Sequence, residues 1–109
     1  MNLQGQVTPE QIEKWKAEVK EKYGENAKVF YYQTEDNRIC YFRSVDRNTY
    51  SLAAAKITSG GAAKFNEQIV TSTWLGGDDT IKKVDSHFFG LIDHIEEMMA
   101  KVKGSLGEC

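Results

Sequence analysis

The sequence predicts a small α+β domain in which a two-stranded antiparallel β-hairpin follows an N-terminal helix and packs with about three further helices. Three observations indicate this fold. A helical apolar pattern begins after Thr8, two adjacent runs of strand-forming residues occupy 29–34 and 39–43, and helical apolar spacing returns over much of the second half. Each predicted element follows from its own local signals, taken below in chain order.

Length and composition favour one globular domain. A chain of 109 residues can bury a core without disulfides or metals, and 40% hydrophobic and 28% charged residues are ordinary proportions. We expect residues 1–7 to form a flexible N-terminus, residues 8–103 the domain, and residues 104–109 a flexible C-terminal tail. The formal net charge of -2 argues against nucleic acid and anionic membranes as partners. No apolar run approaches the roughly 20 residues that span a bilayer, and no secretory signal precedes the first helix.

The first helix has clear start and stop signals. Thr8 is a suitable N-cap, Pro9 suits the first helical position, and Gln11 completes a capping box. Gly24 indicates the C-terminal end. Four apolar side chains recur at helical spacing between these limits: Ile12, Trp15, Val19 and Tyr23. This stripe is narrow, so the helix could dock on the domain's own core or on a second chain.

The two runs that follow predict a β-hairpin. Residues 29–34 and 39–43 are rich in aromatic and β-branched residues, and the polar residues 35–38 between them suit a turn. Aromatic residues occupy both faces of this ribbon, and an isolated hairpin is marginally stable in water. We therefore expect helices to cover one face and a further element or a partner to cover much of the other.

The second half predicts helices separated by glycines. Asp46 is a candidate N-cap for a helix that Ser59-Gly60-Gly61 interrupts, and another helix covers about 62–74. Gly76-Gly77 is expected to end that helix. A last helix starts near Asp85 or Ser86, and its apolar positions are Phe88, Leu91, Ile92, Ile95, Met99 and Val102. Phe89 and Met98 widen this stripe, which is either the main wall of the core or an exposed binding face.

The two cysteines predict neither a disulfide framework nor a metal site. Cys40 lies in an apolar run, where a buried free thiol is expected, and Cys109 follows a glycine-containing tail. A disulfide between them has little support, and no CxxC spacing is present. These features fit a reducing cytosol.

The search for catalytic chemistry finds no complete constellation, so we expect neither enzymatic activity nor a cofactor. His87 and His94 are seven residues apart, and two helical turns would separate their imidazoles by about 10 Å, too far to share one metal ion. Neither Gly60-Gly61 nor Gly76-Gly77 is long enough to cradle a phosphate. No nucleophile turn of the G-x-S-x-G type occurs.

Aromatic residues beside Arg38, Arg43 and Arg47 admit three interpretations. They could stack nucleic-acid bases, but the RNP pattern is missing and the chain is acidic. They could pack the core, or they could contact a protein, since Tyr, Phe, Trp and Arg are enriched at interfaces. Protein binding is the functional interpretation, with these candidate contact residues: Tyr31, Tyr41, Arg43, Phe89, Met98 and Met99. Basic residues predominate over 38–64 and acidic residues over 78–97. This distribution fits solvated helix faces, or a dipolar surface that could steer head-to-tail self-association or a charged partner.

One sequence motif is more specific than the residue composition can explain. Asn66-Glu67 precedes Trp74-Leu75-Gly76-Gly77-Asp78, and both follow a strand and the pair Asp46-Arg47. This order resembles small tailed-phage and prophage proteins related to tail assembly chaperones. From its residue types, the motif has structural roles: Trp74 would bury apolar area, the glycines would let the chain reverse, and Asp78 would cap the next turn.

The resemblance implies a non-enzymatic α+β protein of virion morphogenesis, located in the cytoplasm of a bacterial host. Such proteins coat the tape-measure protein during tail assembly, and some form oligomers. The resemblance therefore implies a protein partner, possible homo-oligomerisation, and no nucleic acid, membrane or cofactor. A small phage-encoded inhibitor of a host protein, acting as an anti-defence factor, is the alternative.

Overall fold

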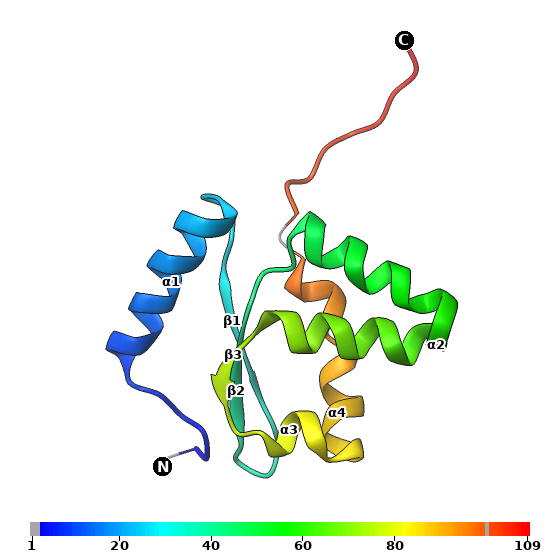
Figure 1. The fold of residues 1–109 in the computed structure, drawn as a ribbon. Coiled ribbons are helices and arrows are strands. Elements are labelled where there is room, and N and C mark those ends of the chain that lie inside the picture. The colour runs from blue at the N-terminus through cyan, green and yellow to red at the C-terminus, as the bar shows by residue number, and fades with distance from the viewer. Residues whose placement is uncertain (1–2, 100) are drawn as a thin grey trace.

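A computed structural model describes residues 3–99 and 101–109 and shows an α+β fold (Figure 1). The elements follow in this order: α1 (Pro9–Tyr23), β1 (Val29–Gln33), β2 (Ile39–Arg43), α2 (Arg47–Thr73), β3 (Trp74–Gly77), α3 (Thr80–Lys83), α4 (Asp85–Ile92) and the 3-10 helix η1 (Ile95–Met98). The antiparallel sheet has the order β1-β2-β3. In Figure 1, α1 lies on one side of this sheet, and α2, α3 and α4 lie on the other. No helix in the described ranges is long and apolar enough to cross a membrane.

The α+β class is confirmed, but the sheet has three strands instead of the expected two. β3 is formed by the residues that we expected to end a helix, and Gly77 pairs with Cys40 of β2. Gly77 has φ 123°, and a Cβ atom there would lie 2.4 Å from the Cα of Cys40. Glycine therefore lets the third strand approach β2 closely.

Helix α1 begins as predicted and covers part of the sheet. The Gln11 N–H donates to the Thr8 hydroxyl at 3.2 Å, and the helix ends before Gly24, which has φ 107°. Trp15 packs against Tyr41 of β2 with ring centroids 5.5 Å apart. The apolar stripe of α1 thus docks on its own sheet.

Helix α2 contains the two expected helices as two arms. Gly61, with φ 68° and ψ -159°, interrupts the helical backbone where the sequence predicts a break. Asp46 stands at the N-cap position with an extended backbone, but its side chain makes no cap hydrogen bond. Its carboxylate instead accepts from Arg43 at 3.0 Å.

The last helix is shorter than predicted. α4 ends at Ile92, Asp93 and His94 form a turn, and η1 ends at Met98. Val102 is 84% exposed and lies outside any helix. The expected continuous apolar face from Phe88 to Val102 is therefore wrong.

The core lies between the sheet and the α2–α4 layer. Its buried residues come from β2, both arms of α2, α3, α4 and η1: Cys40, Phe42, Ala53, Ile69, Val70, Ile81, Leu91, Ile95 and Met98. Phe42 meets the half-buried Trp74 edge to face, with ring centroids 5.3 Å apart. This layer fixes the position of α4 and η1 relative to β1.

The two ends of the chain differ in their contacts. Residues 3–7, within the expected flexible N-terminus, are held to the hairpin: the Gln4 N–H donates to the Asn37 carbonyl and the Ile39 N–H donates to the Gln4 carbonyl, each at 2.9 Å. Residues 101–109 are exposed, have no secondary structure and extend away from the body (Figure 1).

Candidate functional site

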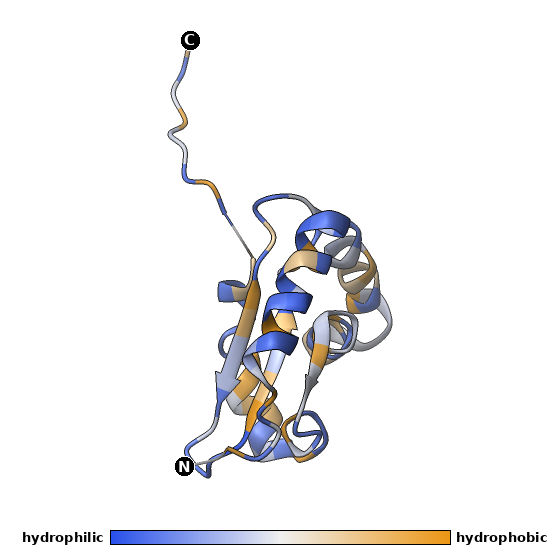
Figure 2. Ribbon diagram, turned by 90° about the vertical axis from the view of Figure 1, so that its left-hand side faces the viewer, coloured by the Kyte–Doolittle hydropathy of each residue, from blue (hydrophilic) through white to orange (hydrophobic). Residues whose placement is uncertain are grey.

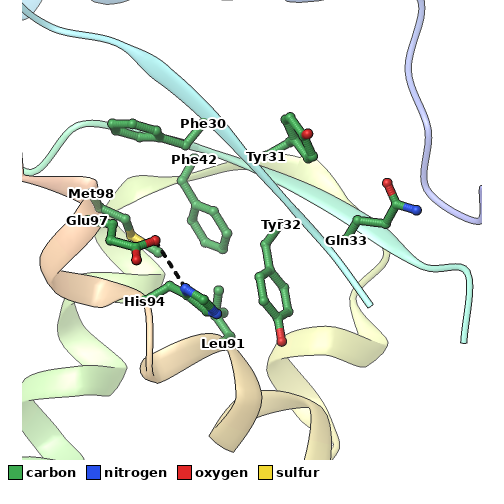
Figure 3. A pocket seen from close by; sticks show the side chains of 9 residues that line it. All are labelled: Phe30, Tyr31, Tyr32, Gln33, Phe42, Leu91, His94, Glu97 and Met98. Carbon is green, nitrogen blue, oxygen red and sulfur yellow. Dashed lines mark hydrogen bonds and ion pairs between the residues drawn. The ribbon is translucent and has the colours of Figure 1, made fainter. Parts of the chain in front are cut away.

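Two pockets that share lining residues lie between strand β1 and the α4–η1 segment, and Figure 3 shows the side chains that line the first. The first has a volume of about 440 Å³ and is lined by Phe30, Tyr31, Tyr32, Gln33, Phe42, Leu91, His94, Glu97 and Met98. The second has a volume of about 470 Å³ and is lined by Tyr32, Gln33, Thr34, Glu35, Asp36, Ser86, His87 and His94. Tyr32, Gln33 and His94 line both. We call this continuous surface the β1 groove.

Strand alternation decides which β1 side chains face the helices. Phe30 and Tyr32 pack toward the core, whereas Tyr31 points to the opposite face of the sheet (Figure 3). The ring of Tyr32 lies 5.5 Å from that of His94, centroid to centroid. Gly90 of α4 makes room for Tyr32, since a Cβ atom there would lie 2.7 Å from the tyrosine oxygen.

The apolar and polar parts of the β1 groove occupy opposite ends. The Phe30 end has a floor of Phe42, Leu91 and Met98, all buried. The other end follows the hairpin turn, with Thr34, Glu35 and Asp36. The β1 groove can therefore offer an apolar contact and a polar contact to the same ligand.

Negative charge surrounds the groove. The Glu97 carboxylate lies 3.1 Å from Nδ1 of His94, and the Asp36 carboxylate lies 2.7 Å from Nε2 of His87. Asp36 also accepts from Arg38 at 3.3 Å. Burial raises the pKa of Tyr32, and nearby Cys40, Asp93 and Glu35 raise it further. Hydrogen bonds from Thr34 and His87 hold the pKa of Asp36 well below its usual range. Among the residues described, neither pocket is lined by a lysine or an arginine.

The predicted contact residues occupy different environments. Tyr31 is 69% exposed and Phe89 is 62% exposed, so both are available to a partner. Tyr41 and Met98 are buried and Met99 is half-buried. Of these five, Tyr31 and Met98 line the β1 groove, with Met98 on its floor.

Arg43 is buried and belongs to the interior instead of an exposed contact surface. Its guanidinium donates to the Asp46 carboxylate and the Thr49 hydroxyl, and it also donates to the Ser72 carbonyl at 3.0 Å. The guanidinium carbon lies 4.1 Å from the ring centroid of Tyr23. These contacts tie the end of β2 to both ends of α2 and to α1.

The motif residues take structural positions. Asn66 and Glu67 lie on the second arm of α2, and Trp74, Gly76 and Gly77 lie in β3. Asp78 follows β3 and accepts from the Thr80 N–H at 2.9 Å, whereas Asp79 stands at the N-cap position of α3 without a side-chain cap hydrogen bond. It also accepts from Arg38 at 2.7 Å. Arg38 thereby joins the hairpin turn to the turn after β3.

Both histidines line the second pocket, but each contacts a different carboxylate. His87 contacts Asp36 of the hairpin turn, and His94 contacts Glu97 of η1. Within the described part of the chain, no three His, Cys, Asp or Glu side chains gather to hold a metal ion. Cys40 is buried, and this burial raises the pKa of its thiol to about 12.

Several groove residues were missed from the sequence. Phe30, Tyr32, His94 and Glu97 are absent from the predicted contact set, although all line the groove. The period-2 pattern of β1 separates Tyr32 from Tyr31 and is the one local signal that could have found it. His94 and Glu97 become groove residues through tertiary packing alone.

Comparison with known protein families, curated proteins and solved structures finds no match to this chain.

Proposed function

We propose that this protein is a non-enzymatic binding module that holds a segment of another polypeptide in the β1 groove. The observation that carries this proposal is the combination of an open apolar floor with an edge strand. The groove offers Phe30 and Tyr32 beside the buried Leu91, and β1 has β2 on one side and no strand of the described residues on the other. Protein-binding sites commonly combine such aromatic surface with polar surroundings.

The cellular role that we propose is that of a chaperone-like protein of phage tail assembly in the cytoplasm of a bacterial host. Its support is the sequence resemblance carried by Asn66-Glu67 and Trp74-Leu75-Gly76-Gly77-Asp78. A protein of this kind would cover a long partner, the tape-measure protein, at repeated places and as more than one copy. Exposed Tyr31 and Phe89 provide further apolar surface for such contacts.

Co-expression with the tape-measure protein encoded in the same genome tests this role. Size-exclusion chromatography with light scattering should give one complex whose mass requires several copies of this chain for each tape-measure protein. The tail-tube protein of the same genome serves as the control, and no complex should form when it replaces the tape-measure protein. Separate elution of the chain and the tape-measure protein would contradict the role.

A further inference from the structure

We infer that the β1 groove takes an extended peptide segment, which adds to the sheet beside β1 as a fourth strand and carries an apolar side chain with a lysine or arginine two or four residues away. This inference rests on the proposed protein binding and specifies its ligand. The occupant is a segment of a separate partner protein. Three features of the groove support it: a free strand edge, an apolar pocket and an acidic surround.

The hydrogen-bond register exposes the outer edge of β1. The Thr34 N–H donates to the Arg38 carbonyl and the Ser44 N–H donates to the Lys28 carbonyl, each at 2.9 Å. In an antiparallel pair, the residues that exchange such bonds alternate along the strand. Phe30 and Tyr32 therefore direct their backbone groups to β2, whereas the intervening residues direct theirs away from the sheet.

The outward-facing backbone groups belong to Val29, Tyr31 and Gln33. No hydrogen bond among the described residues uses their main-chain N–H or C=O on the outer side. In Figure 2, β1 lies at the margin of the sheet, and no strand of the described residues lies on the side of β1 opposite β2. Such an edge can accept a peptide strand through main-chain hydrogen bonds.

The apolar end of the groove determines the chemical type of one side chain of the peptide. Phe30 and Tyr32 stand on the helix-facing side of the sheet, with Leu91 and Met98 beneath them. A strand beside β1 would present alternate side chains on this same side. An aliphatic or aromatic side chain is the chemistry that fits this pocket.

The polar end determines the second side chain. Glu35 lines the pocket near the hairpin turn beside Asp36, whose carboxylate already pairs with Arg38 and His87. Glu97 lines the neighbouring pocket, and Asp93 lies close to Tyr32. Because no described lysine or arginine lines either pocket, a cationic side chain is complementary to this end. Residues on one face of a strand recur at about 6.6 Å, so positions two or four residues from the apolar side chain reach it.

Affinity selection from a displayed library of random dodecapeptides tests the ligand class on the complete chain. The expected result is enrichment of peptides with an apolar residue and a lysine or arginine two or four positions away. Selection of acidic peptides, or of no common pattern, would overturn the inference. A synthetic peptide of residues 101–109, which contains Lys101, Val102 and Lys103, is included as a competitor. Stronger binding by this peptide than by the selected ones would assign the groove to the chain's own tail.

The variant Tyr31→Pro tests the added strand directly. Proline removes the outward N–H of residue 31 and no bond to β2, so binding of a selected peptide should fall about tenfold or more. Tyr31→Ala removes the exposed ring but keeps the N–H, and this control should weaken binding much less. Equal loss in both variants would overturn the added strand in favour of a side-chain contact.

N-methylated peptides make the test independent of how Tyr31→Pro folds. Methylation at the residues that face β1 should abolish binding to the unmodified protein, whereas methylation at the alternate residues should change it less than about twofold. Equal effects at both sets would refute strand addition.

Charge reversal of two acidic groove residues tests whether the peptide needs a lysine or arginine. Glu35→Lys combined with Glu97→Lys should weaken binding about fivefold or more, and Glu18→Lys on α1 serves as the control with no effect. Unchanged binding in the groove double variant would overturn the requirement for lysine or arginine. If the tape-measure protein binds equally to all these variants, the assembly role stands, but the β1 groove is not its binding site and the inferred groove ligand is wrong. If the selected peptides bind as expected but the tape-measure protein does not, the assembly role fails alone.

Discussion

Tyr31 and Tyr41 are direct partners across β1 and β2, yet Tyr31 is 69% exposed and Tyr41 only 4%. The two side chains lie on the same face of the sheet. α1 accounts for the difference, because Trp15 packs on Tyr41 and also lies against Gly76 of β3. Within this face, α1 therefore covers Tyr41 and leaves the Tyr31 ring exposed.

Tyr41→Ala should lower the free energy of unfolding by about 3 kcal/mol, because it removes a buried aromatic ring and its contact with Trp15. Tyr31→Ala should change it by less than about 0.5 kcal/mol, since its ring is exposed. Urea denaturation followed by tryptophan fluorescence measures both. Equal losses would mean that α1 covers both tyrosines.

Arg43→Met should destabilise the protein by about 3 kcal/mol. The substitution keeps the aliphatic stem but leaves Asp46, Thr49 and the Ser72 carbonyl without their buried donor. Arg47→Met is the matched control, because Arg47 is exposed at the start of α2 and should cost less than about 0.5 kcal/mol. Thermal melting would reveal the difference, and similar melting temperatures would refute the interior role of Arg43.

Gly77→Ala should be more harmful than Gly24→Ala, although both glycines have positive φ. The added methyl group at Gly77 would clash with the backbone of Cys40, whereas nothing lies within 4 Å of a Cβ atom at Gly24. Backbone strain alone costs about 1–3 kcal/mol, so only the first variant should lose the third strand. Amide hydrogen exchange of β2 measures this loss. Unchanged protection in Gly77→Ala would show that β3 does not need the close approach.

Asp78 should make the stability depend on pH in the acidic range. Its desolvation favours the neutral form, but hydrogen bonds from the Thr80 N–H and from Arg38 outweigh it and lower the pKa. A lowered folded-state pKa stabilises the fold above the unfolded-state value of about 3.9 and loses this effect as the pH falls through the folded-state value.

The measurement compares the wild-type protein with Asp78→Asn by urea denaturation from pH 7 to pH 3. The difference in unfolding free energy should be largest near neutral pH and shrink below about pH 4. Arg38→Gln should remove part of this pH dependence, because Arg38 donates to Asp78 at 2.7 Å. A constant difference at all pH values would contradict the role of the Asp78 carboxylate.

Local signals were sufficient for many elements of the fold. Thr8, Pro9 and Gly24 predicted the limits of α1, and the alternating runs predicted β1 and β2. Glycine at position 61 marked the kink in α2. Each of these signals acts within a few residues, through a cap, a fixed φ angle or a periodic pattern, so the sequence displays it directly.

Longer-range pairing escaped prediction. Trp74–Gly77 has no strong strand pattern and becomes β3 because it pairs with Cys40 and Phe42 of β2. The last helix stops at Ile92, although its apolar spacing continues. Tertiary packing can override such local preference, and here the 3-10 helix η1 buries Ile95 and Met98 while Val102 stays exposed.

By itself, the sequence determined that the hairpin would be aromatic on both faces and would need cover on each. Only the tertiary structure decided which aromatic residues stay accessible. It brought His94 of the α4–η1 turn to Tyr32, and it placed α1 over Tyr41 but not over Tyr31. The physical reason is that alternation assigns a side chain to a face of the sheet, whereas its exposure depends on where distant helices pack on that face.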